Sequence, residues 1–176
     1  DYFMPPVSNL LHGQFNLAPD VMCFDLNQGC CAFLQGLIQG FLFLERIPEK
    51  KVVVCTSDVL SKKVSKQDRN SYPLIGDGAG IAVLERDDTA PEIHSIFYND
   101  GTRWDTLLIP AGGSRLPCGP ETAIPKDTDG DGNLRALDNL CMKGSDVFTF
   151  VQTSIPPLID EILTDARLSK DEVDWF

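Results

Sequence analysis

Cys30 is the residue whose type and position are best suited to covalent chemistry. It follows the turn-forming residues Asn27, Gln28 and Gly29, and it opens a stretch in which apolar residues recur with helical spacing. The start of a helix has backbone N–H groups without intrahelical partners, and the helix dipole favours an anion there. Because the thiolate is the reactive form of cysteine, this position predicts a nucleophile that forms a covalent intermediate. The alternative is that Cys30 is a small buried residue, as most free cysteines are.

A basic stretch offers a second candidate site. Residues 61–73 contain four cationic side chains, those of Lys62, Lys63, Lys66 and Arg69. Arginine pairs with phosphate and stacks on flat aromatic rings, so Arg69 is suited to a nucleotide. The alternative is an ordinary solvated loop, which is what charged segments usually are.

Residues 127–138, DTDGDGNLRALD, match the spacing of a calcium-binding loop. Asp127, Asp129, Asp131 and Asp138 stand at its first, third, fifth and twelfth positions, and Gly132 stands at the sixth. Two features argue against calcium: the preceding PCGPETAIPK is unsuited to an entering helix, and aspartate at the last position is shorter than the usual glutamate. The alternative is the tip of a solvated hairpin, which we expect here.

Other metal sites are not indicated by the sequence. It has two histidines, His12 and His94, and no C-x-x-C pair, so we expect no zinc site. His12 lies beside leucines, where a histidine is more often packed or surface-lying than a ligand or base.

The elements that must position the cysteine read as a strand, a helix and a second strand. Val21–Leu26 is a short apolar run of strand length, and the helix after it continues to near Arg46. Lys51–Thr56 is a β-branched run typical of a central parallel strand, which completes a βαβ unit. Gly36 and Gly40 share one face of the helix, where we expect another segment to pack closely.

The rest of the chain contains further elements of both kinds. Leu74–Glu85, LIGDGAGIAVLE, reads as a glycine-rich turn that enters a strand, which differs from a dinucleotide-binding fingerprint because no helix follows. Glu92–Tyr98 reads as another strand, and residues 114–144 read as a long polar insertion. Ser145 is the expected N-cap of a last helix that runs to about Arg167.

Composition narrows the classes of function. The 176 residues, 43% of them hydrophobic, are enough for one globular domain. The formal net charge of −11 argues against nucleic-acid binding through phosphate contacts. The most apolar helix is interrupted by Gln35, Gln39 and Glu45, so we expect no membrane span. Cysteines in apolar strand-like or helical stretches, rather than in a disulfide framework, indicate the reducing cytoplasm.

Several motifs resemble segments of the 3-oxoacyl-(acyl carrier protein) synthase III family, which has the thiolase fold. FDLNQGCCAFLQGL is similar to the family's FD-x-x-A-A-C-S-G-F-x-x-G-L, and LIGDGAGIAVLE to its F-G-D-G-A-G-A-x-V-L-E. The stretch from Asp100 to Gly113 is similar to its D-G-x-x-x-x-x-L-x-x-P-x-G pattern. The sequence departs from the family beside the cysteine, where Gln28, Gly29 and Cys31 replace Ala, Ala and Ser.

The resemblance implies an α/β fold and an acyltransferase reaction. The complete family chain forms two similar halves of a layered αβαβα sandwich, usually as a homodimer. Residues 1–176 are then a single partial domain that covers the end of the first half and the start of the second, with 114–144 inserted. An acyl-CoA acylates the cysteine, and malonyl-(acyl carrier protein) loses carbon dioxide so that its carbanion attacks the thioester. This chemistry serves fatty-acid or related polyketide biosynthesis and needs no cofactor, because the coenzyme A thioester is the substrate.

The resemblance also assigns roles to residues. Cys30 falls on the family's acylated cysteine, and its backbone N–H would donate to the thioester oxygen. Arg69 lies at the family's spacing from that cysteine and would contact the nucleotide of coenzyme A. The family's catalytic histidine, in H-Q-A-N, and a later asparagine have no counterpart here, and neither His12 nor His94 stands in such a motif. We therefore expect an internal fragment of a longer protein, incomplete for the full condensation.

Two other classes of function stay open from the sequence. One is a non-catalytic half-domain that binds acyl groups or serves assembly. The other is a calcium-binding module built on residues 127–138. An H-Q-A-N motif in the longer parent sequence would favour the enzyme over the half-domain.

Overall fold

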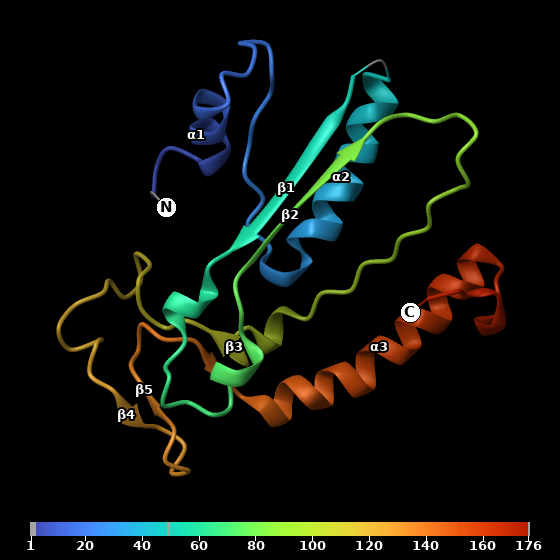
Figure 1. Ribbon diagram of the computed structural model, residues 1–176. Helices are drawn as coiled ribbons and strands as arrows, with labels where there is room; N and C mark the ends of the chain where they lie inside the picture. The colour runs from blue at the N-terminus through green and yellow to red at the C-terminus, as the bar shows by residue number, and fades with distance from the viewer. Residues whose placement is uncertain (1–2, 49, 176) are drawn as a thin grey trace. The chain divides into compact units, whose positions relative to one another are not determined.

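The computed structural model describes residues 3–48 and 50–175, and Figure 1 shows their helices and strands. They fall into two compact units. The first comprises Asp1–Ser57 with Ala79–Asp88, and the second comprises Asp58–Gly78 with Thr89–Phe176. The candidate nucleophile belongs to the first unit, and the basic stretch belongs to the second.

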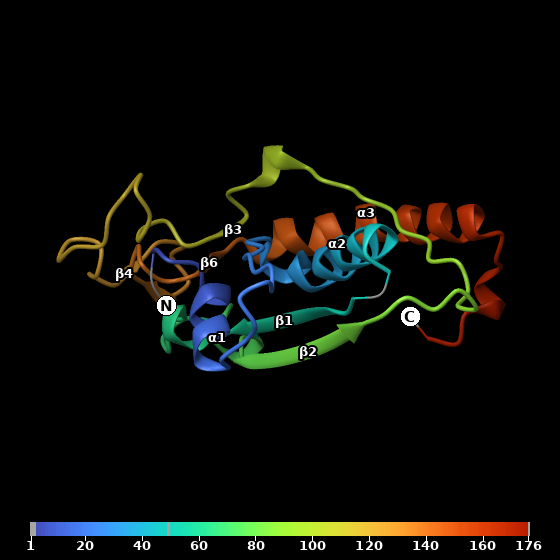
Figure 2. The same cartoon turned by 90° about the horizontal axis from the view of Figure 1, so that it is seen from above.

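The first unit is a helix packed on a two-stranded sheet. Helix α2, Ala32–Arg46, lies along one face of the sheet formed by β1, Val52–Asp58, and β2, Gly78–Leu84 (Figures 1 and 2). Lys51 forms an ion pair with Glu85 at 2.6 Å, and the Thr56 hydroxyl donates to the Gly80 carbonyl at 3.3 Å. Thr56 lies five residues after Lys51, and its partner Gly80 lies five residues before Glu85. The two strands therefore run antiparallel. The predicted helix and both of these strands are therefore confirmed.

Two glycines allow α2 to approach the sheet closely. A Cβ on Gly36 would lie 2.8 Å from Val54 Cγ1. A Cβ on Gly40 would overlap Leu84 Cδ1 and would lie 3.2 Å from Val52 Cγ1. Both glycines are buried, so the close packing predicted from their spacing is confirmed.

Helix α1, Val7–Gln14, is joined by hydrogen bonds to the segment that precedes Cys30. The Asp25 carboxylate accepts the backbone N–H of Val7 at 2.8 Å and that of Ser8 at 2.9 Å, so it caps the first turn. Desolvation alone would raise the pKa of Asp25, but the hydrogen bonds outweigh this effect and lower the pKa. Val21–Leu26, which contains Asp25, has no ladder partner within the described residues, so the predicted strand and parallel βαβ unit are wrong here.

The second unit is built from short strand pairs and one long helix (Figure 1). Strand β3, Leu107–Leu108, pairs antiparallel with β6, Cys141–Met142. Strand β4, Lys126–Asp127, pairs antiparallel with β5, Leu134–Arg135, and so forms a hairpin. Helix α3, Gly144–Ala166, is the last α-helix of the described residues. Short 3-10 turns complete the chain: η1 Gly29–Cys31, η2 Leu60–Lys63, η3 Tyr72–Leu74, η4 Gly101–Arg103 and η5 Lys170–Glu172.

Two sequence predictions for the second unit need correction. Glu92–Tyr98 forms no strand, because no other described segment pairs with its backbone. The last helix has Lys143 as its N-cap, so Ser145 lies inside the first turn instead. Its predicted end is confirmed: Arg167 is the C-cap, with a left-handed φ of 57°.

The interior of the second unit contains both apolar and polar side chains. Across the described residues the buried hydrophobic side chains are those of Leu44, Val64, Ala111, Ala136 and Leu140. The buried polar ones all belong to the second unit, and they are Asp68, Ser71, Thr122, Asn133 and Arg135. None of the described helices has the length and apolar character needed to cross a membrane.

Candidate active site

Cys30 lies in the 3-10 turn η1, which leads directly into α2. The helix predicted to open at this cysteine is confirmed with one difference, since its α-helical part begins at Ala32. Gly29 has a φ of +51°, a left-handed conformation that residues with a Cβ rarely adopt. This explains the glycine immediately before the cysteine: it turns the chain sharply into the helix. The Cys30 side chain is exposed among the described residues, so it is not part of their buried core.

The backbone around Cys30 offers a donor as well as a nucleophile. Cys31 donates its N–H to the Gln28 carbonyl at 3.2 Å, and Ala32 donates to the Gly29 carbonyl. The Cys30 N–H lies ahead of these bonds, where a helix start leaves N–H groups without intrahelical acceptors. An acyl oxygen next to the Cys30 sulfur would meet this donor as negative charge develops on it. The arrangement is therefore suited to acyl transfer onto the thiol.

Cys55 and Cys141 are less suited to this chemistry. Cys55 is exposed on strand β1 and has no helix start beside it. Cys141 is half-buried in β6, and burial raises the pKa of its thiol, which disfavours the reactive thiolate.

Arg69 lines a pocket of about 350 Å³ in the second unit. Its Nη2 donates to the Asp131 carbonyl at 3.1 Å, and its backbone N–H donates to Asn133 Oδ1 at 3.3 Å. The basic stretch and the acidic hairpin, predicted as separate features, therefore line one pocket. The pocket is lined by Lys66, Gln67, Arg69, Tyr72, Pro73, Asp131, Gly132 and Asn133. Cations, an aromatic ring and amides are the groups that bind nucleotides.

Two aspartates of the calcium-like motif, Asp127 and Asp129, accept hydrogen bonds from the hairpin itself. Asp127 accepts the N–H groups of Gly130 at 2.8 Å and Gly132 at 3.0 Å, and both glycines have positive φ. Asp129 accepts the Asp131 N–H at 3.1 Å, and this hydrogen bond is the main cause that lowers the pKa of Asp129. The expected hairpin is thus confirmed. Within the described part of the chain no group of three or more His, Cys, Asp or Glu side chains is placed to hold a metal ion.

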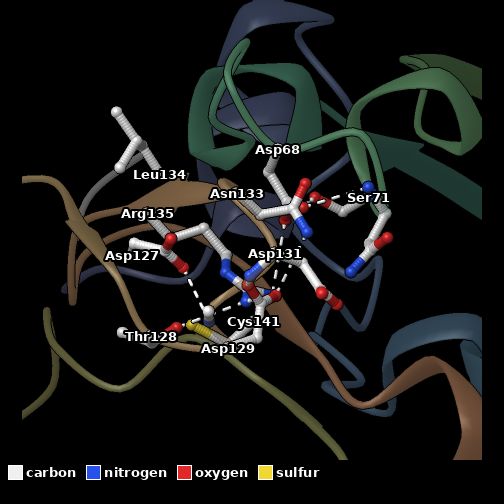
Figure 3. Close-up of polar contacts among 12 residues, drawn as sticks. Asp68, Ser71, Asp127, Thr128, Asp129, Asp131, Asn133, Leu134, Arg135 and Cys141 are labelled. Atoms are coloured by element: carbon white, nitrogen blue, oxygen red, sulfur yellow. Dashed lines mark hydrogen bonds and ion pairs between the residues drawn. The ribbon is translucent and has the colours of Figure 1, made fainter.

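A buried ion-pair network connects this hairpin to the loop that carries Arg69. Asp68 is fully buried; its carboxylate accepts the Ser71 hydroxyl at 2.6 Å and lies 3.6 Å from Arg135 Nη1. Arg135 Nη2 pairs with the Asp129 carboxylate and donates to the Thr128 hydroxyl at 3.2 Å (Figure 3). Asp68 and Arg135 do not stand out in the sequence, because both lie in segments whose charge density is typical of solvated loops.

Both histidine rings lie within hydrogen-bond distance of a partner. His12 Nε2 lies 3.0 Å from the Ala18 carbonyl oxygen, and His94 Nδ1 lies 2.9 Å from the Asp165 carboxylate. These contacts agree with structural roles for the two rings.

The chain is similar to known proteins, and the matched region includes the candidate site. Residues 24–101, which include the cysteine turn and the glycine-rich strand, match the model of the 3-Oxoacyl-[acyl-carrier-protein (ACP)] synthase III family. The whole chain is 34% identical over 176 residues to beta-ketoacyl-[acyl-carrier-protein] synthase III 2 of Bacillus anthracis, 50% of which it covers. It is 30% identical to beta-ketoacyl-[acyl-carrier-protein] synthase III of Clostridium beijerinckii, of which it covers 51%. The chain thus spans about half the length of the curated relatives it matches.

Solved structures show the same relationship. A 2.1 Å crystal structure of a 3-oxoacyl-(acyl-carrier-protein) synthase III superposes with a TM-score of 0.91 at 26% identity, covering 99% of this chain and 52% of that one. A 3-oxoacyl-(acyl-carrier protein) synthase from Burkholderia xenovorans LB400 superposes with a TM-score of 0.81, also at 26% identity, covering 99% and 48%. The expected thiolase-like α/β fold is therefore confirmed.

Proposed function

The chain belongs to the 3-oxoacyl-(acyl carrier protein) synthase III family, and from this premise we propose that it carries the acyl-cysteine step of a decarboxylative Claisen condensation. The Cys30 thiolate attacks the carbonyl carbon of an acyl-CoA, the bond from that carbon to the coenzyme A sulfur breaks, and coenzyme A leaves as a thiolate. Malonyl-(acyl carrier protein) then loses carbon dioxide. Its carbanion attacks the acyl-cysteine and releases 3-oxoacyl-(acyl carrier protein) and the free Cys30 thiolate.

The observation that carries this proposal is the exposed Cys30 in the turn before α2. The left-handed Gly29 directs the chain into the helix, and the proposal has the Cys30 N–H donate to the developing oxyanion. Nucleophile and donor thus come from one residue, and the packing of α2 on β1 and β2 holds both in place.

The proposal assigns Arg69 to the nucleotide of coenzyme A. The pocket it lines combines the Lys66 and Arg69 cations with the Tyr72 ring, which suits a phosphorylated nucleotide. The proposal also includes an acyl carrier protein as partner and a homodimer as assembly, both on the strength of family membership. Donors for the decarboxylation step would come from the part of the relatives that this chain does not span.

Acylation is tested by incubating the chain with radiolabelled acetyl-CoA and mapping the labelled peptide by mass spectrometry. Label on Cys30, its loss in Cys30→Ser and its retention in the matched control Cys31→Ser would support the proposal. Equal labelling of wild type and Cys30→Ser would refute the role of Cys30. Adding malonyl-(acyl carrier protein) to a longer protein that includes this chain then tests condensation. Acylation without 3-oxoacyl product there would favour the non-catalytic half-domain.

A further inference from the structure

The loop that carries Arg69 and the 126–135 hairpin are joined by hydrogen bonds along their length. The Leu134 N–H donates to the Gln67 carbonyl at 3.2 Å, and the Ser65 hydroxyl donates to the Leu134 carbonyl at 2.6 Å. The Arg69 N–H donates to Asn133 Oδ1 at 3.3 Å, and the Asn133 side chain is almost fully buried. The backbone on either side of Arg69 is therefore defined by the hairpin.

Beneath these bonds lies a buried pair of opposite charges. The side chain of Arg135 is 6% exposed and that of Asp68 is 0% exposed, and Arg135 also pairs with Asp129 (Figure 3). Burial of a charge is costly unless a partner compensates it, so each of these groups depends on the others. Arg135 Nε has no hydrogen-bond partner among the described residues, so the guanidinium is held through its two terminal nitrogens.

The ion-pair network of Asp68, Arg135 and Asp129 also organises the turn that contains Arg69, the residue next to Asp68. Asp68 also accepts the Asn70 N–H at 3.0 Å and the Ser71 hydroxyl at 2.6 Å, so its carboxylate organises the turn that contains Arg69. The Arg69 guanidinium then lies against the Asp131 carbonyl at the edge of the pocket. A side chain already ordered in this way loses less conformational entropy when it binds an anion.

We propose that Arg135 is a positioning residue for nucleotide binding: through its buried pairing with Asp68 and Asp129 it presents Arg69 to the phosphorylated nucleotide of coenzyme A. The inference rests on the proposed function, which assigns Arg69 to that nucleotide. It gives the 114–144 insertion a role that its calcium-like sequence does not suggest. Arg135 does not line the pocket, so its effect on binding passes through Arg69.

The test measures the affinity of the chain for coenzyme A by calorimetry in the wild type, Arg135→Met and Arg69→Ala. Because Arg135→Met should leave the Arg69 side chain less ordered, we expect the affinity for coenzyme A to fall on the order of three- to tenfold. The matched control is Arg86→Met, which removes an exposed arginine paired with Asp88 and should leave the affinity unchanged. An undiminished affinity in Arg135→Met would overturn the inference.

Two further readouts separate positioning from general damage to the fold. Acetylpantetheine lacks the nucleotide, so the rate at which it acetylates Cys30 should be the same in Arg135→Met and wild type, whereas a merely structural defect would slow it. In the double variant Arg69→Ala/Arg135→Met, the second substitution should add little, because Arg135 acts through Arg69. Additive losses would refute this route.

The outcomes also distinguish the inference from the proposed function. If Arg69→Ala keeps full affinity for coenzyme A, the assignment of Arg69 fails. If Arg69→Ala weakens binding while Arg135→Met does not, the positioning role alone fails. Should Arg135→Met not fold, Arg135→Lys keeps the charge without the planar fork and Asp68→Asn keeps the shape without the charge. Each of these must then weaken coenzyme A binding while acetylpantetheine still reacts at the normal rate, or the inference is wrong.

Discussion

Replacing Gly36 with alanine would test how the helix behind Cys30 is held on the sheet. The added Cβ would lie 2.8 Å from Val54 Cγ1, closer than carbon atoms approach without a shift. Val54 is β-branched, so its side chain has few alternative rotamers with which to move away. The helix, the strand or both must therefore give way.

Two opposing effects set the magnitude. Extra volume in a packed contact costs about 1–3 kcal/mol, whereas replacing glycine by alanine inside a helix gains about 1 kcal/mol. The expected net loss for Gly36→Ala is thus up to about 2 kcal/mol in the free energy of unfolding. Gly13 in α1 is the matched control, because a Cβ there meets nothing within 4 Å and the substitution keeps only the helix-propensity gain.

Urea unfolding followed by circular dichroism would measure both variants. Gly36→Ala should unfold at a lower urea concentration than wild type, and Gly13→Ala should unfold at the same or a higher one. If Gly36→Ala were as stable as Gly13→Ala, the close contact between α2 and β1 would not exist as described. The helix that follows Cys30 would then not be held on the sheet by this packing.

Three further outcomes are expected. Iodoacetamide at neutral pH should alkylate Cys30 faster than Cys141, as mapped by mass spectrometry; the reverse order would contradict the nucleophile assignment. The pKa of Asp25 is lowered in the folded chain, so its stabilising effect is present above the ordinary aspartate pKa of 3.8 and is lost as pH falls further; the urea midpoint of Asp25→Asn should lack this acid-side dependence. Millimolar calcium should leave the urea midpoint unchanged, because internal donors already engage Asp127 and Asp129, and a clear rise would restore the calcium hypothesis.

Features that depend on neighbouring residues were predictable from the sequence. The helical spacing after Cys30 and the turn formers before it define α2 and its start. The i, i+4 spacing of Gly36 and Gly40 predicts their close packing, because residues four apart share a helix face. The β-branched run before Ser57 becomes β1 for a similarly local reason.

Features that depend on distant partners were not predictable in this way. Val21–Leu26 and Glu92–Tyr98 have the composition of strands, yet a strand also needs a second backbone to satisfy its N–H and C=O groups. The described residues provide none for either segment. The Asp68–Arg135 pair joins positions 67 residues apart by number, and no local pattern indicates which charged residue of a polar loop will be buried.

The charge distribution of the hairpin explains how a chain with a net charge of −11 can offer a site for an anion. The carboxylates of Asp127 and Asp129 turn onto backbone N–H groups and onto Arg135, and neither residue lines the pocket. Asp131 does line it, and there its carbonyl accepts Arg69. Two of the three aspartates are thus compensated within the hairpin, and the cations of Lys66 and Arg69 line the pocket from the facing loop. If Arg69 binds the nucleotide as proposed, the sequence that resembles a cation site would in its folded form support the binding of a phosphate.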